Sequence, residues 1–268
     1  MERQEIMANT LDTIYALWLR EIIRFVKSKS RVIGTGGQPL IWLAIVGVGF
    51  GSAFASAGLH GSFGVISYVA FIAPGIIGMT ILFSSIFGGV SVIWDRQFGF
   101  LKEILVAPVS RVGIVLGKVL GSATVSLIAA LVIFFVIVAV GIIPLNILSA
   151  SGVIMAIIFM IFIAMSFVSI GLIIASYVNN VEGFQVLINF LILPLFFLSG
   201  ALFPLTNAPL WMKGISAIDP LQYGVDGMRG ALVGVHTYPV YLDFIIVFAV
   251  TVALILIADI SFRRIQGK

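Results

Sequence analysis

Long apolar tracts alternate with short polar segments along this chain, and their lengths predict membrane-spanning helices. No Asp, Glu, Lys or Arg occurs from Val32 to Ile93 or from Val119 to Val181. A helix needs about 20 apolar residues to cross the hydrocarbon core of a bilayer. Six segments meet this requirement and are predicted to span: residues 39–57, 67–93, 119–142, 149–178, 184–203 and 241–262. The whole chain, 1–268, is therefore predicted to be a single all-α polytopic membrane domain.

The N-terminal segment, residues 9–35, is amphipathic rather than uniformly apolar. At about 100° per residue, six apolar side chains fall on one stripe of a helix: Leu11, Ile14, Tyr15, Trp18, Ile22 and Phe25. Four basic side chains fall almost opposite: Arg20, Arg24, Lys27 and Arg31. Such a helix suits the inner membrane surface, where anionic lipids attract basic residues. An ordinary surface helix of a water-soluble part is the alternative.

Residues 94–118 form a charged island between two uncharged tracts. The island carries six charged residues: Asp95, Arg96, Lys102, Glu103, Arg111 and Lys118. A segment with these charges must leave the hydrocarbon, and we expect it to form a cytoplasmic loop. Helical spacing places Phe98, Leu101 and Leu105 on one face, and Pro108 ends the helix. The pattern predicts a short helix that docks in a cleft of a partner protein, with a simple interfacial turn as the alternative.

Residues 204–239 are too polar to span a membrane and too apolar to form a plain loop. The Asp219-Pro220 pair can start a helix, and the glycines that follow can end one. We expect short helices that re-enter the outer leaflet. Tyr223, Asp226 and Arg229 recur at steps of three, so they share a face on which the last two can pair. A functional gate and a surface cap with a solvated ion pair both fit this pattern.

The positions of the charged residues predict the orientation of the chain. It is 61% hydrophobic and only 10% charged, whereas an average soluble domain is about a quarter charged. Of the Lys and Arg residues, six precede the first span, four lie in the charged island and three follow the last span. Only Lys213 and Arg229 fall on the other side. Because basic residues concentrate on cytoplasmic flanks, both termini are predicted to be cytoplasmic, in the plasma (inner) membrane, and the net charge of +4 implies no nucleic-acid partner.

No motif for chemistry of its own is found in the chain. The segment Gly113–Leu120, GIVLGKVL, is not a Walker A motif, because its first Gly is one position too close and Val119 replaces the Ser or Thr. There is no Cys, and the two histidines, His60 and His236, have no carboxylate cluster at ligand spacing. We therefore expect no metal site, no catalytic residue and no enzyme activity, with energy supplied by another protein. Glycines at steps of four favour close helix packing: Gly47 with Gly51, and Gly117 with Gly121.

The charged island, WDRQFGFLKEILVAPVSRVGIVLGK, resembles the pattern around the coupling helix of ABC-2 type permeases, particularly drug-resistance and nodulation-type exporters. The shared features are an acidic-basic pair, a Gly, two Leu, a Pro-x-Ser-Arg run and a Gly-Lys pair: Asp95, Arg96, Gly99, Leu101, Leu105, Pro108, Ser110, Arg111, Gly117 and Lys118. Phe100 departs from the pattern, since the family often has Thr there. The stretch from Leu198 to Gly230 resembles the family's outer re-entrant helices.

The resemblance implies a permease subunit of an ATP-binding cassette exporter, which moves an amphiphilic or lipid-like compound out of the cytoplasm or inner leaflet by alternating access. A separate ATPase subunit would hold the ATP and Mg²⁺, and this chain would hold no cofactor. A second permease copy or homologue would complete a homodimer or heterodimer in the lipid bilayer. A lipid-linked polysaccharide or glycoconjugate exporter is the alternative of the same architecture, and a channel or receptor without an ATPase is the alternative of a different class.

The resemblance also assigns roles to individual residues. The implied ATPase contacts are Asp95, Arg96, Phe98, Gly99, Leu101, Glu103, Leu105, Pro108, Ser110 and Arg111. The implied outer re-entrant or gate residues are Pro220, Tyr223, Asp226 and Arg229. The transport pathway is expected along spans one, two and five, where Phe196 and Phe197 are the candidate lining residues.

Overall fold

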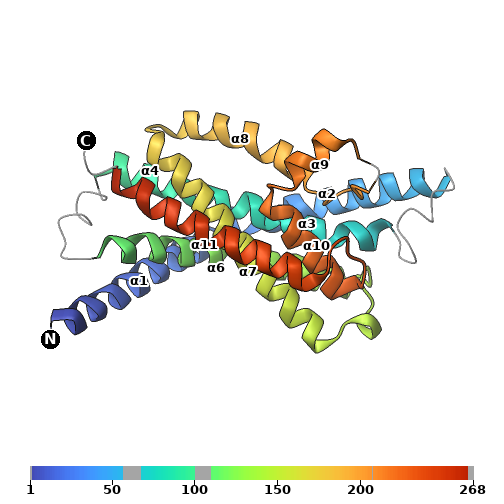
Figure 1. Ribbon diagram of the computed structural model, residues 1–268, viewed down its shortest axis with the longest axis horizontal. Helices are drawn as coiled ribbons and strands as arrows, with labels where there is room; N and C mark the ends of the chain where they lie inside the picture. The colour runs from blue at the N-terminus through green and yellow to red at the C-terminus, as the bar shows by residue number, and fades with distance from the viewer. Residues whose placement is uncertain (1, 57–67, 100–109, 207, 265–268) are drawn as a thin grey trace.

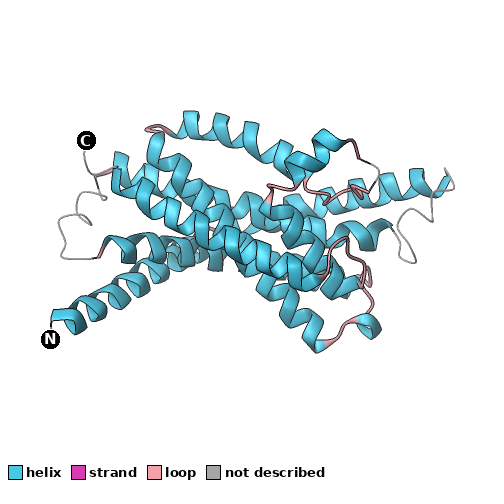
Figure 2. Cartoon of the chain, in the orientation of Figure 1, coloured by secondary structure: helices cyan, strands magenta, loops and turns pink. Residues whose placement is uncertain are grey.

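A computed structural model describes residues 2–56, 68–99, 110–206 and 208–264, which form helices and no strand (Figures 1 and 2). Most of the helices run along the long axis of the molecule. The elements are α1 (Glu2–Lys27), α2 (Lys29–Ser56), α3 (Tyr68–Ile86), the short 3-10 helix η2 (Phe87–Gly89), α4 (Val90–Gln97), α6 (Arg111–Ala139), η3 (Leu145–Ile147), α7 (Ala150–Tyr177), α8 (Val181–Leu198), α9 (Leu210–Ser216), α10 (Pro220–Val233) and α11 (Val240–Arg264).

Five helices in the described part of the chain are long and apolar enough to cross a bilayer. They cover Tyr68–Gln97, Arg111–Ala139, Ala150–Tyr177, Val181–Leu198 and Val240–Arg263. These helices correspond to the predicted spans two to six and make this an integral membrane protein. The predicted first span falls in α2, whose apolar stretch, Gly37–Ser52, is shorter. The count of six spans therefore stays a prediction.

Short polar residues set where three of these helices begin. The side chains of Ser110, Ser149 and Asn180 each accept a hydrogen bond from the backbone N–H three residues later, which satisfies a free donor in the first turn. The Ser110 cap starts α6 at Arg111, eight residues before the predicted start of the third span. Part of the charged island is therefore helical and continuous with a span.

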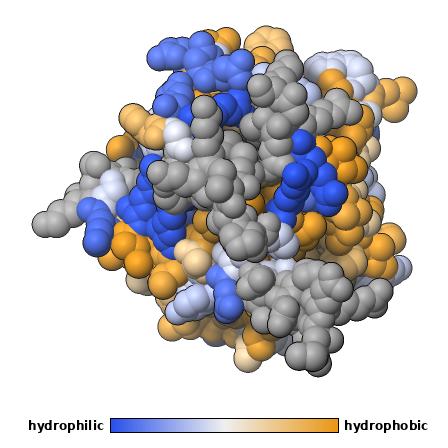
Figure 3. Space-filling view, turned by 90° about the vertical axis from the view of Figure 1, so that its left-hand side faces the viewer, coloured by the Kyte–Doolittle hydropathy of each residue, from blue (hydrophilic) through white to orange (hydrophobic). Residues whose placement is uncertain are grey.

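The two ends of the bundle are made of different elements. One end, called here the terminal end, is where α1 begins, α11 ends, α4 ends and α6 begins (Figure 1). Figure 3 looks onto this end and shows hydrophilic side chains gathered on it, with hydrophobic ones between and around them. The opposite end holds α9, α10 and the turn between α6 and α7. This arrangement agrees with a chain that crosses the membrane repeatedly.

Helix α3 is the centre of the bundle. It packs against α2, α6, α7 and α10, and nearly all of its residues are buried. Two glycines permit the closest approaches. A side chain at Gly75 would collide with the backbone of Ala201, and one at Gly89 in η2 would collide with the backbone of Gly171 in α7. These close backbone contacts are typical of membrane helices, where small residues let helices approach.

Helix α1 buries a face that coincides only in part with the one that its hydrophobic pattern indicates. It lies alongside the first half of α6, and its buried residues are Thr13, Leu17, Glu21 and Phe25. Leu11 and Tyr15 of the predicted apolar stripe are instead 65% and 60% exposed. The buried face therefore overlaps only partly with the predicted apolar stripe, and the interfacial role of α1 stays a prediction.

The segment before the last span forms the two short helices α9 and α10, as expected. Asp219 caps α10 by accepting a hydrogen bond from the Leu221 N–H, and Pro220 occupies its first turn. Gly234, with a φ of +77°, ends it. Helix α10 lies against α3, α7 and α11, so it is part of the core and not a surface cap.

Candidate functional site

A buried carboxylate joins three helices near the terminal end. Asp95 of α4 pairs with Arg20 of α1 at 2.5 Å and with Lys118 of α6 at 2.6 Å, each cation meeting a different carboxylate oxygen. We call these three residues the charge triad. Asp95 and Lys118 are 3% and 1% exposed. The triad therefore fixes the last helical turns before residues 100–109 to two other helices.

The triad changes what the sequence analysis assigned to its members. Asp95 is a predicted ATPase contact, and its side chain is buried between α1, α4 and α6. The predicted contact stays a prediction. Arg20 was expected on a lipid-facing basic surface and points instead at Asp95. Lys118 lies within α6 and not in a loop. Burial of these charges is tolerated because each has a partner of opposite sign at hydrogen-bond distance.

Arg96 connects α4 to a fourth helix. Its guanidinium donates to the carbonyl of Ala175 at 3.0 Å, to that of Val178 at 3.3 Å and to the Asn179 side chain at 2.8 Å. Carbonyls at the end of a helix lack partners within that helix and carry partial negative charge, so a cation there is stabilising. Arg96, also expected at the ATPase contact, thus anchors the end of α7.

The glycines of α6 provide the groove in which α1 lies. A side chain at Gly113 would meet Thr10 of α1. One at Gly117 would meet Ile14 and Leu17, and one at Gly121 would meet Trp18 and Glu21. The Trp18 indole N–H donates to Thr124 Oγ1 at 3.0 Å across the same contact. The predicted packing role of Gly117 with Gly121 is confirmed. Gly47 with Gly51 is confirmed as well, since both face α3 at Val69.

The described residues on either side of positions 100–109 follow closely on the triad. Phe98 is 81% exposed, and Gly99 has a φ of +78°, a conformation that favours glycine and ends α4. Ser110 and exposed Arg111 mark the return into α6. The other predicted ATPase contacts, Leu101, Glu103, Leu105 and Pro108, lie outside the described residues.

A second polar cluster lies at the opposite end, around Arg229 of α10. Its guanidinium donates to the carbonyls of Phe71 at 3.1 Å and Gly200 at 3.0 Å and faces the Phe71 ring at 3.9 Å. Asp226 lies 3.4 Å from Arg229 and accepts from the N–H groups of Thr237 and Tyr238 at 2.7 and 2.9 Å. Both side chains are buried, so the alternative of a solvated ion pair is wrong. The pair holds α3, α10 and the chain before α11 together.

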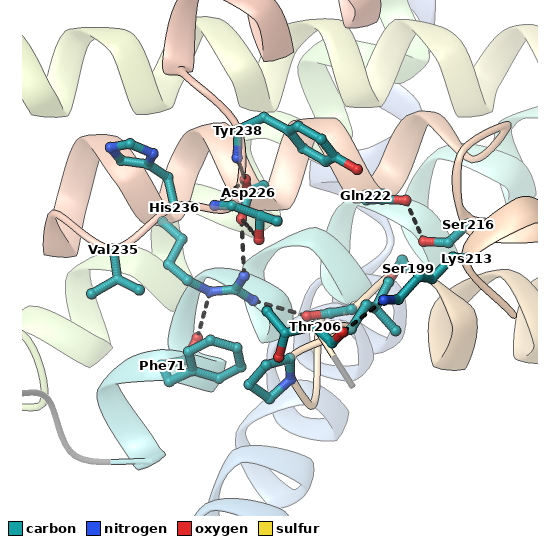
Figure 4. A pocket seen from close by; sticks show the side chains of 15 residues that line it. Phe71, Ser199, Thr206, Lys213, Ser216, Gln222, Asp226, Val235, His236 and Tyr238 are labelled. Carbon is teal, nitrogen blue, oxygen red and sulfur yellow. Dashed lines mark hydrogen bonds and ion pairs between the residues drawn. The ribbon is translucent and has the colours of Figure 1, made fainter. Parts of the chain in front are cut away.

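This cluster borders a cavity of about 330 Å³ (Figure 4). Phe71, Asp226 and His236 lie on one side of it, and Ser216 with Gln222, which are hydrogen-bonded to each other, lie on another. Burial lowers the pKa of Arg229 to about 10, although Asp226 opposes the shift, so the guanidinium stays charged at neutral pH. A gate role for this cluster stays a prediction.

Tyr223 and Asp219 complete the polar cluster around Arg229, which we call the outer cluster after its predicted position. The Tyr223 hydroxyl donates to the carbonyl of Ala217 at 2.9 Å, and burial raises its pKa. Burial also raises the pKa of Asp219 to about 7, against the opposing effect of its hydrogen bond from Leu221. These hydrogen bonds fix the turn between α9 and α10.

The two predicted pathway residues of α8 are not equivalent. Phe196 is 1% exposed and packs in the core, whereas Phe197 is 40% exposed. The exposed side of α8 carries five large apolar side chains, Val186, Leu187, Phe190, Leu193 and Phe197, together with the polar Glu182, Gln185 and Asn189. Only Phe197 is therefore accessible from outside the bundle.

Comparisons with known proteins agree with this architecture. The family model described as ABC-2 type transporter matches residues 12–233. The chain is 30% identical over 222 residues to ycf38 of Pyropia yezoensis, which is named a transport permease, covering 82% of this chain and 73% of that protein. It is 25% identical over 260 residues to the inner membrane transport permease YadH of Escherichia coli K12, covering 94% and 95%. It is 27% identical over 229 residues to nodulation protein J of Rhizobium leguminosarum bv. trifolii, covering 82% and 80%.

The match spans the charge triad, the glycine groove and the outer cluster alike. The resemblance inferred from the charged island is thereby confirmed. Since the family model covers most of the chain and the structure is a bundle of apolar helices, the protein belongs to the ABC-2 type transporter family of membrane permeases.

Proposed function

We propose that this chain is the membrane subunit of an ATP-driven exporter, which moves an amphiphilic compound out of the cytoplasm or inner leaflet. The observation that carries the proposal is the charge triad. It ties α4, which leads directly into residues 100–109, to α1 and α6, while Arg96 ties the same helix to α7. A force applied to this segment by a partner would therefore move four helices together.

An ATPase subunit is the proposed source of that force. Exposed Phe98 and Arg111 flank residues 100–109 at the terminal end, which we propose to be cytoplasmic. The absence of a Walker A motif from the sequence supports placing ATP hydrolysis in another protein. ATP and Mg²⁺ would then bind to the partner, and this chain would act by conformational coupling.

The ATPase contact is tested by copurification. Leu101→Arg and Glu103→Arg should each abolish copurification of a coexpressed ATP-binding subunit and ATP-dependent transport. The matched control is Leu145→Arg, because Leu145 is 74% exposed at the opposite end of the bundle and the same charge there should leave the complex intact. An intact, transporting complex in both Leu101→Arg and Glu103→Arg would contradict the proposal.

A second permease copy is proposed to cover the exposed side of α8. This helix packs less into the bundle than α3, and Phe190 is 82% exposed. The chain contains no cysteine, so a single Phe190→Cys variant reports on this face alone. Oxidation should give a disulfide-linked dimer with Phe190→Cys. The control is Leu256→Cys on α11, where the native residue is 59% exposed, and this variant should give no dimer. Equal cross-linking at both positions would indicate random collision.

A further inference from the structure

A larger cavity, of about 610 Å³, lies between α1, α2, α3–α4 and the start of α8. Its volume falls in the range of about 300–1,000 Å³ that is typical of sites for small molecules. Met79, Phe83 and Phe87 form an apolar wall. Gln38 of α2 and Gln185 of α8 also line it and are exposed, so the cavity opens between these two helices.

Arg24 is the only charged residue among the described residues that line this cavity. Its guanidinium carbon lies 5.4 Å from the centre of the Trp94 ring, and its Nη1 atom is buried without a hydrogen-bond partner. The neighbouring acids are not among the residues that line the cavity. Asp95 is held by the two cations of the charge triad, and Glu21 lies with its Cβ and Cγ against Gly121 of α6. The positive charge of Arg24 is therefore not balanced by an acid within the cavity.

A buried guanidinium donor without an acceptor favours a carboxylate or phosphate oxygen, which it binds more strongly than a neutral group. The apolar wall beside it favours hydrocarbon. Trp94, 37% exposed and close to the end of α4, suits the level of lipid head groups. We propose that this cavity binds an anionic amphiphile, with its head group on Arg24 and its acyl chain along Met79, Phe83 and Phe87. That this molecule is the cargo rests on the function proposed above.

The test measures which lipid reaches Trp94. The full chain is reconstituted in phosphatidylcholine vesicles that contain either brominated phosphatidylglycerol, which is anionic, or brominated phosphatidylcholine. Bromine quenches tryptophan fluorescence on contact. The chain has four Trp, so the Trp94 contribution is the difference between each protein and its Trp94→Phe counterpart.

Brominated phosphatidylglycerol should quench Trp94 at a concentration roughly tenfold or more below that of brominated phosphatidylcholine, as expected for a charge-assisted hydrogen bond. Arg24→Gln should remove this preference and Arg24→Lys should largely keep it, which separates loss of charge from misfolding. The matched control is Lys27→Gln, an exposed basic residue one turn further along α1, which should keep the preference.

Equal quenching by the two lipids in the unmodified chain would overturn the proposal. So would a preference that survives in Arg24→Gln, or one that Lys27→Gln removes to the same extent, because attraction to the whole basic surface would then explain it. The measurement needs no ATPase and no transport. Failure here therefore removes the anionic ligand but not the proposed export function, and failure to find an ATPase leaves this binding result standing.

Discussion

Replacing Asp95 by Leu should destabilise the protein more than replacing either of its cationic partners. The substitution leaves the Lys118 ammonium, whose side chain is 2% exposed, with a long hydrogen bond of 3.4 Å to Ser91 Oγ. Removing one member of a buried ion pair costs about 3–5 kcal/mol, because the other charge stays buried without compensation. We expect a loss of that size in the free energy of unfolding.

The exposure of the paired side chains also predicts how much stability other substitutions in these ion pairs should cost. Arg20→Gln should cost about 1 kcal/mol, because the Arg20 side chain is 29% exposed and the Asp95–Lys118 pair remains. The double variant Asp95→Leu with Lys118→Met removes both buried charges and should be more stable than Asp95→Leu alone. Arg263→Gln is the control, since its pair with Asp259 is more exposed.

The assay is reversible unfolding by denaturing detergent, followed by far-ultraviolet circular dichroism in mild-detergent micelles. The free energies of unfolding of the single and double variants are then compared. Asp95→Leu should lower stability, and the addition of Lys118→Met should raise it again. A double variant as unstable as, or less stable than, Asp95→Leu alone would refute the reasoning, because an unpaired Lys118 would then not be the cause of the loss.

Three further predictions concern the core and the outer cluster. Gly75→Ala should destabilise by about 1–3 kcal/mol because the new methyl group meets the Ala201 backbone, whereas Gly49→Ala, with open space around it, should be neutral or slightly stabilising in thermal melts. Arg229→Lys should increase proteolysis at the opposite end of the bundle, because a single ammonium cannot reproduce the forked contacts of the guanidinium to three segments. Resistance to proteolysis equal to that of the unmodified protein would contradict this prediction. The pKa of Asp219 is raised to about 7 in the folded protein, so its contribution to stability is complete when the pH is below the ordinary pKa of Asp and is lost as the pH rises through 7. Melting temperatures should therefore fall from pH 5 to pH 8. Asp219→Asn, which keeps the cap, should flatten that dependence, and an unchanged slope would exclude Asp219 as its source.

The sequence by itself determined most of the helical framework. Long apolar tracts located five spanning helices to within a few residues at most ends, because the hydrocarbon core disfavours charged side chains over most of the length of a span. Asp219 and Pro220 indicated the start of α10 because capping depends on a few consecutive residues. The glycine pair at 117 and 121 indicated a packing face for the same local reason.

Only the tertiary structure decided which charges meet. Arg20 and Asp95 are 75 positions apart, and no periodicity within either segment indicates that they pair. Arg20 belongs to a helix whose hydrophobic stripe predicted a lipid-facing basic side, yet the glycine groove of α6 selects a partly different face for burial and turns Arg20 inward. The same holds for Arg229, whose acceptors lie on α3 and after α8. Local patterns fix where a helix forms, but a buried charge takes its partner from whichever helix the packing brings beside it.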